Sequence, residues 1–397
     1  MDIDLLSPER FASGQPHDQF RWLREHDPVH WHEEPGGPGF WAVTRYEDVW
    51  AVDRDFQTYS SEPTIMIADP TPEAGTAFGP YKMMLMMDPP EHTAFRKLIR
   101  SEFTLPAAHL REGRIQALAR QIVDAVIDRG ECDFVADVAG EMPSFVIAEL
   151  MGLPLDDGRK LYELTETIHT APEALPPGAS AAAVAKMFEY GMGVIAEKRA
   201  RPGDDLASKI LAAEVDGRRL EDPEFLLFFL LLVDAGGDTT RNLLSAGLLA
   251  MMENPEHLAW LREDLDARLP AAREELLRYT SPVIYMRRTA RKDAVLGGKQ
   301  IREGDKVVMY FGSANRDAAK FELPDALALG RPDNDHIAFG TGPHACLGQH
   351  LARIEIDAML KEVLTRMTDF ELAAAPEWLP SNFISGLKAM PLKFRRA

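Results

Sequence analysis

The order of apolar and polar residues predicts a strand and then a helix near the N-terminus. Residues 40–44 are aromatic, β-branched or small, which is typical of a strand, and residues 46–52 carry apolar side chains at helical spacing. The most extended apolar pattern lies further on, over residues 222–253. It predicts a long helix with Asp222 as its N-cap and Pro223 at its first position, stopped by Asn254 and Pro255.

This helix would be roughly 45 Å long at a rise of 1.5 Å per residue. Because it is apolar on all sides, we expect it at the centre of the molecule. A helix is also predicted over 271–279, strands around 294–296 and 306–311, and a last helix over 347–367. The pattern therefore indicates a mainly α fold with small β-sheets, in the α+β class.

The segment between the last predicted strand and the last helix is long, irregular and rich in glycine and proline. Irregular segments of this length in compact proteins are usually functional, so we expect a site there. The chain shows no flexible linker and no internal repeat, and we expect a single domain over residues 1–397.

Composition narrows the classes of function. Of the 397 residues 46% are hydrophobic, enough for one large core, and the formal net charge of -19 opposes binding to nucleic acid or anionic lipid. The apolar run 225–233 ends at Asp234, short of the roughly 20 residues that span a bilayer, and no secretory leader is visible. With only two cysteines, a cytoplasmic location without a membrane anchor is expected.

One of these cysteines, Cys346, lies between a glycine-rich loop and the start of a helix, in the sequence HIAFGTGPHACLGQHLAR of residues 336–353. Backbone N–H groups at a helix start lower the pKa of a thiol, so this position favours a thiolate. Gly340 and Gly342 would let the backbone bend, and Gly348 would let the following helix pack tightly. The alternative is that Cys346 is a small buried apolar residue, as we expect for Cys132.

The surrounding residues decide between these alternatives. Phe339, Gly340, Gly342, His344, Cys346 and Gly348 are spaced as in the cysteine loop of the cytochrome P-450 family, which the chain resembles through several motifs. The resemblance implies the fold of that family, with haem b (iron protoporphyrin IX) between the long central helix and the cysteine loop. It also implies that Cys346 is the axial ligand of the iron, with Phe339 covering the sulfur and Gly340 approaching the haem.

Inside the long predicted helix, the sequence AGGDTT (residues 235–240) interrupts the apolar pattern. Two interior glycines cost roughly 1.5–2 kcal/mol relative to alanine, so we expect a local distortion that serves a ligand. By the resemblance, Asp238 and Thr239 are the acid and alcohol that deliver protons to dioxygen. The alternative for Asp238 is a helix cap or a residue that faces solvent.

The haem propionates require cationic partners. The resemblance assigns this role to His92, Arg96, Arg288 and His344, although Arg287 is adjacent and the arginine assignment could shift by one residue. It assigns a folding role to an ion-pair triad. The triad consists of Glu275, Arg278 and Arg331.

The predicted activity is insertion of one oxygen atom from dioxygen into a hydrophobic terpenoid, steroid or fatty-acid-like molecule. Electrons would come from a separate ferredoxin and its reductase, docked by basic residues among 96–100 or by Arg353. Three alternatives stay open: a peroxide-driven peroxygenase, an enzyme of oxidative coupling, and a haem sensor without turnover. The residues expected to contact substrate are mostly apolar: Ile65, Met66, Ile67, Met83, Met84, Met86, Leu232, Val233, Val283, Ile284, Met286, Phe383 and Ile384.

Overall fold

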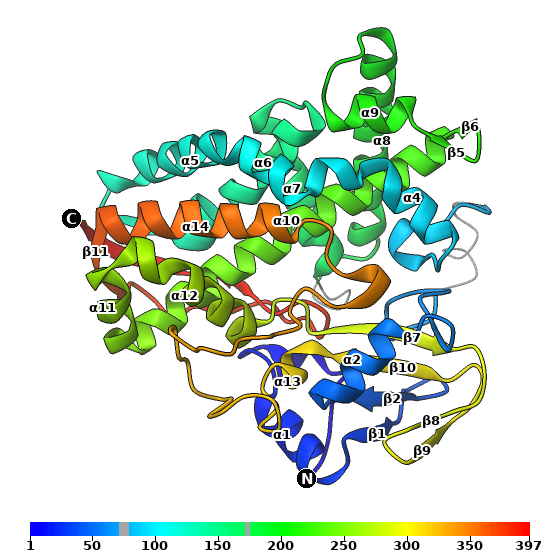
Figure 1. The fold of residues 1–397 in the computed structure, drawn as a ribbon. Coiled ribbons are helices and arrows are strands. Elements are labelled where there is room, and N and C mark those ends of the chain that lie inside the picture. The colour runs from blue at the N-terminus through cyan, green and yellow to red at the C-terminus, as the bar shows by residue number, and fades with distance from the viewer. Residues whose placement is uncertain (71–78, 171–174) are drawn as a thin grey trace.

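The computed structural model describes residues 1–70, 79–170 and 175–397. Helices dominate, as Figure 1 shows, and gather on one side of the molecule, while the largest sheet lies on the other side with α2 and α13. The helices are α1 (His17–His26), α2 (Tyr46–Arg54), α4 (Glu91–Ile99), α5 (Leu105–Ile127), α6 (Glu141–Met151), α7 (Leu155–His169), α8 (Ala179–Ala200), α9 (Leu206–Ala212), α10 (Asp222–Glu253), α11 (Pro255–Glu263), α12 (Leu265–Thr280), α13 (Phe311–Ala314) and α14 (Gln349–Arg366).

The strands form small sheets around this helical body. The largest has the order β1-β2-β10-β7-β3, in which β10 runs parallel to β2 and antiparallel to β7. The strands are β1 (Val29–His32), β2 (Phe40–Val43), β3 (Tyr59–Ser60), β4 (Glu131–Asp133), β5 (Glu214–Val215), β6 (Arg218–Arg219), β7 (Tyr285–Ala290), β8 (Ala294–Leu296), β9 (Lys299–Ile301), β10 (Lys306–Tyr310), β11 (Met367–Leu372), β12 (Glu377–Trp378), β13 (Leu387–Ala389) and β14 (Pro391–Arg396). The predicted α+β class is confirmed.

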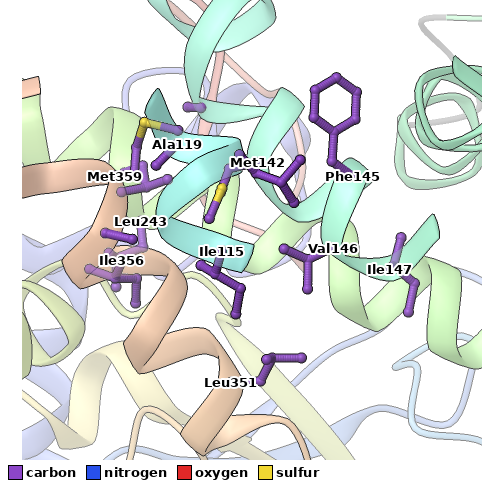
Figure 2. Packing of buried hydrophobic residues seen from close by; sticks show 14 of the residues in the cluster. Ile115, Ala119, Met142, Phe145, Val146, Ile147, Leu243, Leu351, Ile356 and Met359 are labelled. Carbon is purple, nitrogen blue, oxygen red and sulfur yellow. The ribbon is translucent and has the colours of Figure 1, made fainter. Parts of the chain in front are cut away.

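The helical core forms where α5, α6, α10 and α14 meet. Figure 2 shows apolar side chains from these four helices packed together, among them Ile115, Met142, Leu243 and Met359. At about 25 cal/mol per Å² of apolar surface removed from water, such side chains supply most of the stabilisation of the fold. This packing fixes α10 relative to α14, the helix that begins directly after the cysteine loop (residues 336–348).

The long central helix is confirmed as α10, with the predicted bounds and with most of its residues buried. Its cap differs from the prediction. Glu221 is the N-cap, because its side chain accepts a bond from the backbone of Glu224 while the Glu224 carboxylate accepts one from Glu221 N at 2.7 Å. This reciprocal pair is a capping box that Asp222 cannot form.

The helix expected over 271–279 begins earlier, at Leu265, and contains Pro270 within its first turns. Asp264 caps it by accepting from Ala267 N at 3.4 Å. Pro270 is the sixth residue of this helix, so it removes one i→i−4 hydrogen bond, yet the helix continues through it to Thr280. The predicted strands at 40–44, 294–296 and 306–311 correspond to β2, β8 and β10.

Within the described ranges, no single helix combines the length and apolar character needed to cross a bilayer. Two consecutive helical segments, residues 135–151 and 155–168, have the required length and apolar character only when taken together. Their axes are bent by 116° relative to one another.

Candidate functional site

An apolar cavity opens between α10 and the cysteine loop. Seven of the residues predicted from the sequence line it: Arg96, Thr239, Arg288, Phe339, Gly340, His344 and Cys346. They come from α4, α10, β7 and the cysteine loop, so the fold brings together segments that lie up to 250 positions apart. Of the predicted site residues, His92 and Asp238 lie behind this lining.

The cysteine loop is held in a bent conformation by its own backbone. Cys346 N donates to Phe339 O at 2.8 Å. Gly340 and Gly342 have φ angles of 65° and 62°, a region that side chains other than glycine rarely adopt, as the sequence predicted. The prediction for Gly348 was wrong: an added Cβ there would meet no protein atom within 4 Å, because this glycine faces the cavity instead of a packed helix.

The acidity expected for Cys346 is not seen in the protein alone. Burial raises the pKa of the Cys346 thiol, while the N–H of Gly348 and the guanidinium of Arg96 act in the opposite direction. The helix start therefore contributes as predicted, but desolvation of the charged form outweighs it. A thiolate at this position requires a positive partner inside the cavity.

The neighbouring residues Asp238 and Thr239 diverge on α10. Thr239 lines the cavity and its Oγ1 donates to Ala235 O at 3.3 Å. Ala235 is exposed although it lies within a buried helix, because it faces the same cavity. One face of α10 thus lines the cavity from Leu231 to Leu243.

The distortion expected at the two glycines of this helix is not observed. The helix continues without interruption through Gly236 and Gly237. A Cβ at Gly236 would lie 3.5 Å from Ile147 Cδ1, and one at Gly237 would lie 3.7 Å from Tyr162 Cδ2, both ordinary contacts. Gly236 lines the cavity, so its small size leaves space on that side.

Asp238 is directed toward α7. It is 1% exposed, and its Oδ1 lies 3.7 Å from Nη2 of Arg241. Arg241 in turn lies 3.7 Å from Glu166 Oε1 and stacks over the ring of Tyr162. The alternative of a cap or a solvent-facing side chain is therefore wrong, since Asp238 is buried in the middle of the helix within a charged group.

Basic side chains crowd one edge of the cavity. The His92 and His344 rings lie 4.1 Å apart, and Arg96 Nη2 donates to Ala345 O at 2.5 Å. Burial lowers the pKa of His92 to about 4, with a further contribution from Arg96. Burial lowers the pKa of His344 to about 2, with further contributions from Arg288, His92 and Arg96. We call His92, Arg96, Arg288 and His344 the basic cluster.

The pleat of β7 separates the two adjacent arginines. Arg288 lines the cavity, whereas Arg287 binds Asp69 at 2.6 Å and donates to Ile67 O at 3.1 Å. Successive residues of a strand point to opposite faces, which explains the difference. The structure thus brings Arg288, and not Arg287, to the cavity.

The predicted triad is present and buried. Arg278 makes two bonds to Glu275, of 2.7 and 2.8 Å, and Arg331 Nε donates to the same carboxylate at 3.0 Å. Asn334 Nδ2, which the sequence reasoning missed, is a further donor at 3.1 Å. This group fixes the segment before the cysteine loop against α12.

Two acidic residues that line the cavity were also missed. Asp53, on α2, binds Arg288. Glu355, on α14, is buried, its Oε2 finds no hydrogen-bond partner among the described residues, and burial raises its pKa to about 8. A usable signal existed for Asp53, because it follows Tyr46 by seven positions and Val49 by four and so lies on the apolar face of its helix.

Four of the residues expected to contact substrate line the cavity: Met84, Leu232, Val283 and Met286. Others of that set are buried in the protein core: Ile65, Ile67, Val233, Ile284 and Ile384. The lining adds further apolar side chains, among them Leu85, Val146 and Leu243. The walls away from the basic cluster therefore favour a hydrophobic molecule.

Comparison with known proteins gives consistent similarities. The family model described as Cytochrome P450 matches residues 180–378. The chain is 35% identical over 401 residues to a steroid C26-monooxygenase of Mycolicibacterium smegmatis, covering 98% of this chain and 92% of the relative. It is 37% identical over 407 residues to a methyl-branched lipid omega-hydroxylase of Mycobacterium tuberculosis, covering 98% and 94%.

Among solved structures, the fold is similar to that of Mycobacterium marinum cytochrome P450 CYP268A2 in complex with pseudoionone. The TM-score is 0.92 and the sequence identity is 36%, with 99% of each chain covered.

Proposed function

The chain belongs to the cytochrome P450 family, and on that basis we propose that its cavity holds haem b with Cys346 as the axial ligand. The protein is a cytochrome P450 monooxygenase that hydroxylates hydrophobic small molecules with dioxygen. The observation that carries the residue assignment is the position of Cys346 in an apolar cavity whose edge carries the basic cluster.

The residues around the cavity fit a haem. His92 Nδ1 is buried and has no hydrogen-bond partner in the described parts of the chain. Burial, and after it the neighbouring arginines, lowers the pKa values of His92 and His344, so an anion at this edge would meet Arg96 and Arg288 beside two imidazoles. Two propionates would be such anions, and the open space beside Gly348 would admit a flat ring.

When bound, a haem with a thiolate ligand combines dioxygen, two electrons and two protons to place one oxygen atom in a C–H bond and release water. The residues of this chain prepare that reaction. The Cys346 thiol would lose its proton on binding the iron, since metal coordination requires the thiolate. The Thr239 hydroxyl, exposed to the cavity, would hold a proton there.

Asp238 would pass protons from the side of α7 toward Thr239. Its carboxylate is buried and lies near Arg241, which in turn lies near Glu166. Asp238 directly precedes Thr239, which lines the cavity. The apolar walls around Ala235 and Leu232 would exclude bulk water, so that protons arrive by an ordered route.

The substrate class that we propose is a terpenoid, a steroid or a branched lipid. The apolar lining supports it, and so do the similar proteins: one is a steroid C26-monooxygenase, one is a methyl-branched lipid omega-hydroxylase, and a third was solved in complex with pseudoionone. Methionines such as Met84 and Met286 would adapt the walls to different shapes.

We also propose that electrons come from a ferredoxin and its reductase. Of the cations considered for docking, Arg353 is bound to Glu274 by bonds of 2.8 and 2.9 Å, and Arg96 is directed to the cysteine loop. Lys97 and Arg100 are the exposed cations of the segment 96–100 and support the proposal. Two free cysteines support a cytoplasmic location. A single domain is supported by the cavity, because its lining residues come from elements between α2 and α14.

The test is the absorption spectrum of the dithionite-reduced protein with carbon monoxide. We expect a strongly red-shifted Soret band in the wild type and in the matched control Cys132→Ala, and its loss in Cys346→Ala. Addition of terpenoids, steroids and branched fatty acids should then produce a spin shift. An unchanged band in Cys346→Ala would refute the ligand assignment.

The same preparation discriminates the alternatives. The pair Asp238 and Thr239 argues against a peroxygenase, which does not need a proton route to dioxygen. Product formed only with peroxide would favour that alternative, coupled products would favour oxidative coupling, and a haem band without any turnover would favour a sensor.

A further inference from the structure

Asp53 is a buried carboxylate at the edge of the cavity. It lies near the C-terminal end of α2, is 4% exposed, and lines the cavity together with the basic cluster. Its Oδ1 accepts a bond of 2.8 Å from Arg288 Nη2, and the side chains of both residues are almost completely buried. A buried pair of this kind is strongly coupled, because little solvent separates the two charges.

The second oxygen of Asp53 binds the cysteine loop. Oδ2 accepts from Thr341 N at 2.6 Å and lies 3.3 Å from Thr341 Oγ1. A Cβ at Gly342 would come within 2.8 Å of Asp53 O, so the loop and α2 are in direct backbone contact. One carboxylate therefore joins α2, β7 and the loop that carries Cys346.

The charge of Asp53 is distinctive within the described cavity lining. The other acid there, Glu355, has its pKa raised to about 8 by burial and is mainly protonated at neutral pH. The permanent cations are Arg96 and Arg288, and Asp53 neutralises the second of them. A haem with two propionates would therefore bring more negative charge than this edge can balance with arginines alone.

We propose that Asp53 is a positioning residue of the haem site that also lowers the reduction potential of the bound iron. It fixes the Arg288 guanidinium and Thr341 in place for a propionate. Its buried negative charge opposes the arrival of an electron, because reduction adds negative charge to a region of low dielectric constant. This inference rests on the proposed haem site and goes beyond it.

The experiment uses the full-length, haem-loaded protein and the variant Asp53→Asn. Asparagine has nearly the same shape, and its side-chain oxygen can still accept from Thr341 N, while its NH2 group cannot accept from Arg288. The substitution therefore removes one negative charge and the bond to Arg288. The midpoint potential is measured by spectroelectrochemical titration, and haem loss by transfer to apomyoglobin. Glu47→Gln, at an exposed position of the same helix, is the matched control.

We expect Asp53→Asn to keep the red-shifted band of the carbon monoxide complex, to have a more positive midpoint potential and to lose haem faster. Glu47→Gln should match the wild type in all three. An unchanged potential with an intact band would overturn the electrostatic role. Slower haem loss would show that Asp53 competes with a propionate, and it would overturn the positioning role.

A variant that keeps the charge separates the role of Asp53 from general damage to the fold. Asp53→Glu should load haem and retain a potential close to that of the wild type, even if Asp53→Asn does not load haem. If neither variant loads haem, the charge is not the important property and the proposal is overturned. Absence of the red-shifted band in the wild type itself would instead overturn the proposed function, and the role of Asp53 with it.

Discussion

The orientation of Thr239 makes it the residue of α10 best placed to act inside the cavity. Its hydroxyl faces the cavity while Asp238 faces α7. We expect Thr239→Ala to keep haem and the carbon monoxide band, but to divert reducing equivalents to peroxide and to lower product formation by about tenfold or more. The measurement is the ratio of product and peroxide to electrons consumed.

Thr239→Ser is the matched control for this prediction, because it keeps the hydroxyl. It should preserve most of the coupling between electron consumption and product. Equal coupling in Thr239→Ala and the wild type would remove Thr239 from the proton route.

Glu355 predicts a pH dependence of stability. Burial raises its pKa in the folded state to about 8, above the ordinary glutamate value of 4.5, so the folded protein retains a proton that the unfolded chain releases. This contribution to stability is complete below pH 4.5 and is lost as the pH rises through about 8. The slope from this group is at most about 1.4 kcal/mol per pH unit.

Glu355→Gln should therefore flatten the dependence of Tm on pH between 5 and 8, and at pH 8 it should be more stable than the wild type. Thermal unfolding of both proteins across this range is the measurement. Parallel curves for the two proteins would show that Glu355 is not protonated in the fold.

At the residue scale, sequence predicted the identities of the cavity residues better than their chemical states. The family resemblance named seven residues that line one cavity, and their roles there stay predictions. It could not give the pKa of the thiol, because that depends on burial by segments distant in sequence. Asp53 was missed for the same reason, since its partners Arg288 and Thr341 are more than 230 positions away.

At the scale of elements, the turn at Gly342 controls the shape of the cysteine loop. Its φ angle is 62°, and an added Cβ would come within 2.8 Å of Asp53 O. We expect Gly342→Ala to destabilise the protein by about 1–2 kcal/mol or more and to reduce haem retention. Haem content and unfolding in urea measure both effects.

Gly113→Ala is the control for this substitution. Gly113 lies within α5 and is exposed, and a Cβ added there would project into open space. Alanine should stabilise this helix by up to about 1 kcal/mol without affecting haem. Equal haem content in the two variants would contradict the role of the Gly342 turn.

Element boundaries were predictable where local chemistry sets them and not elsewhere. Pro255 ends α10 as expected, because proline following Asn254 cannot continue the same helix. The start of α12 was missed, since Pro270 is tolerated in the first turns when Asp264 caps the helix. The cap of α10 was missed by one residue because a glutamate pair replaced the expected aspartate.

At the scale of the whole molecule, docking of the proposed ferredoxin, if acidic, would have to overcome a formal net charge of -19. A local cation therefore matters more than the overall charge. We expect Arg100→Glu to lower ferredoxin-driven turnover severalfold and to leave the carbon monoxide spectrum and substrate spin shift unchanged. The difference should shrink as salt is added, because salt screens exposed charges.

Lys292→Glu changes an exposed cation between β7 and β8 and serves as the control. It should leave turnover at the wild-type level. An equal loss in both variants would indicate a general effect of charge and would refute a docking role for Arg100.

The arrangement of the sheets was beyond local sequence patterns. In the order β1-β2-β10-β7-β3, two neighbouring strands from residues 285–310 lie between strands from the first 60 residues. Strand patterns identify candidate segments, but pairing over such separations depends on the assembled helical body. The α+β class was predictable from helix content, whereas the strand order was not.

The packing of α5 against α14 has a consequence for how the protein is made. Residues 105–127 leave the ribosome long before residues 349–366, which cover them in the finished fold. Throughout that interval, the nascent chain carries apolar surfaces of α5 and α10 without their partner helix. Since the cysteine loop directly precedes α14, haem insertion must also wait until residues 336–348 have been synthesised. Sites of translational pausing late in the message would then prolong the exposure of these surfaces and the demand for chaperones.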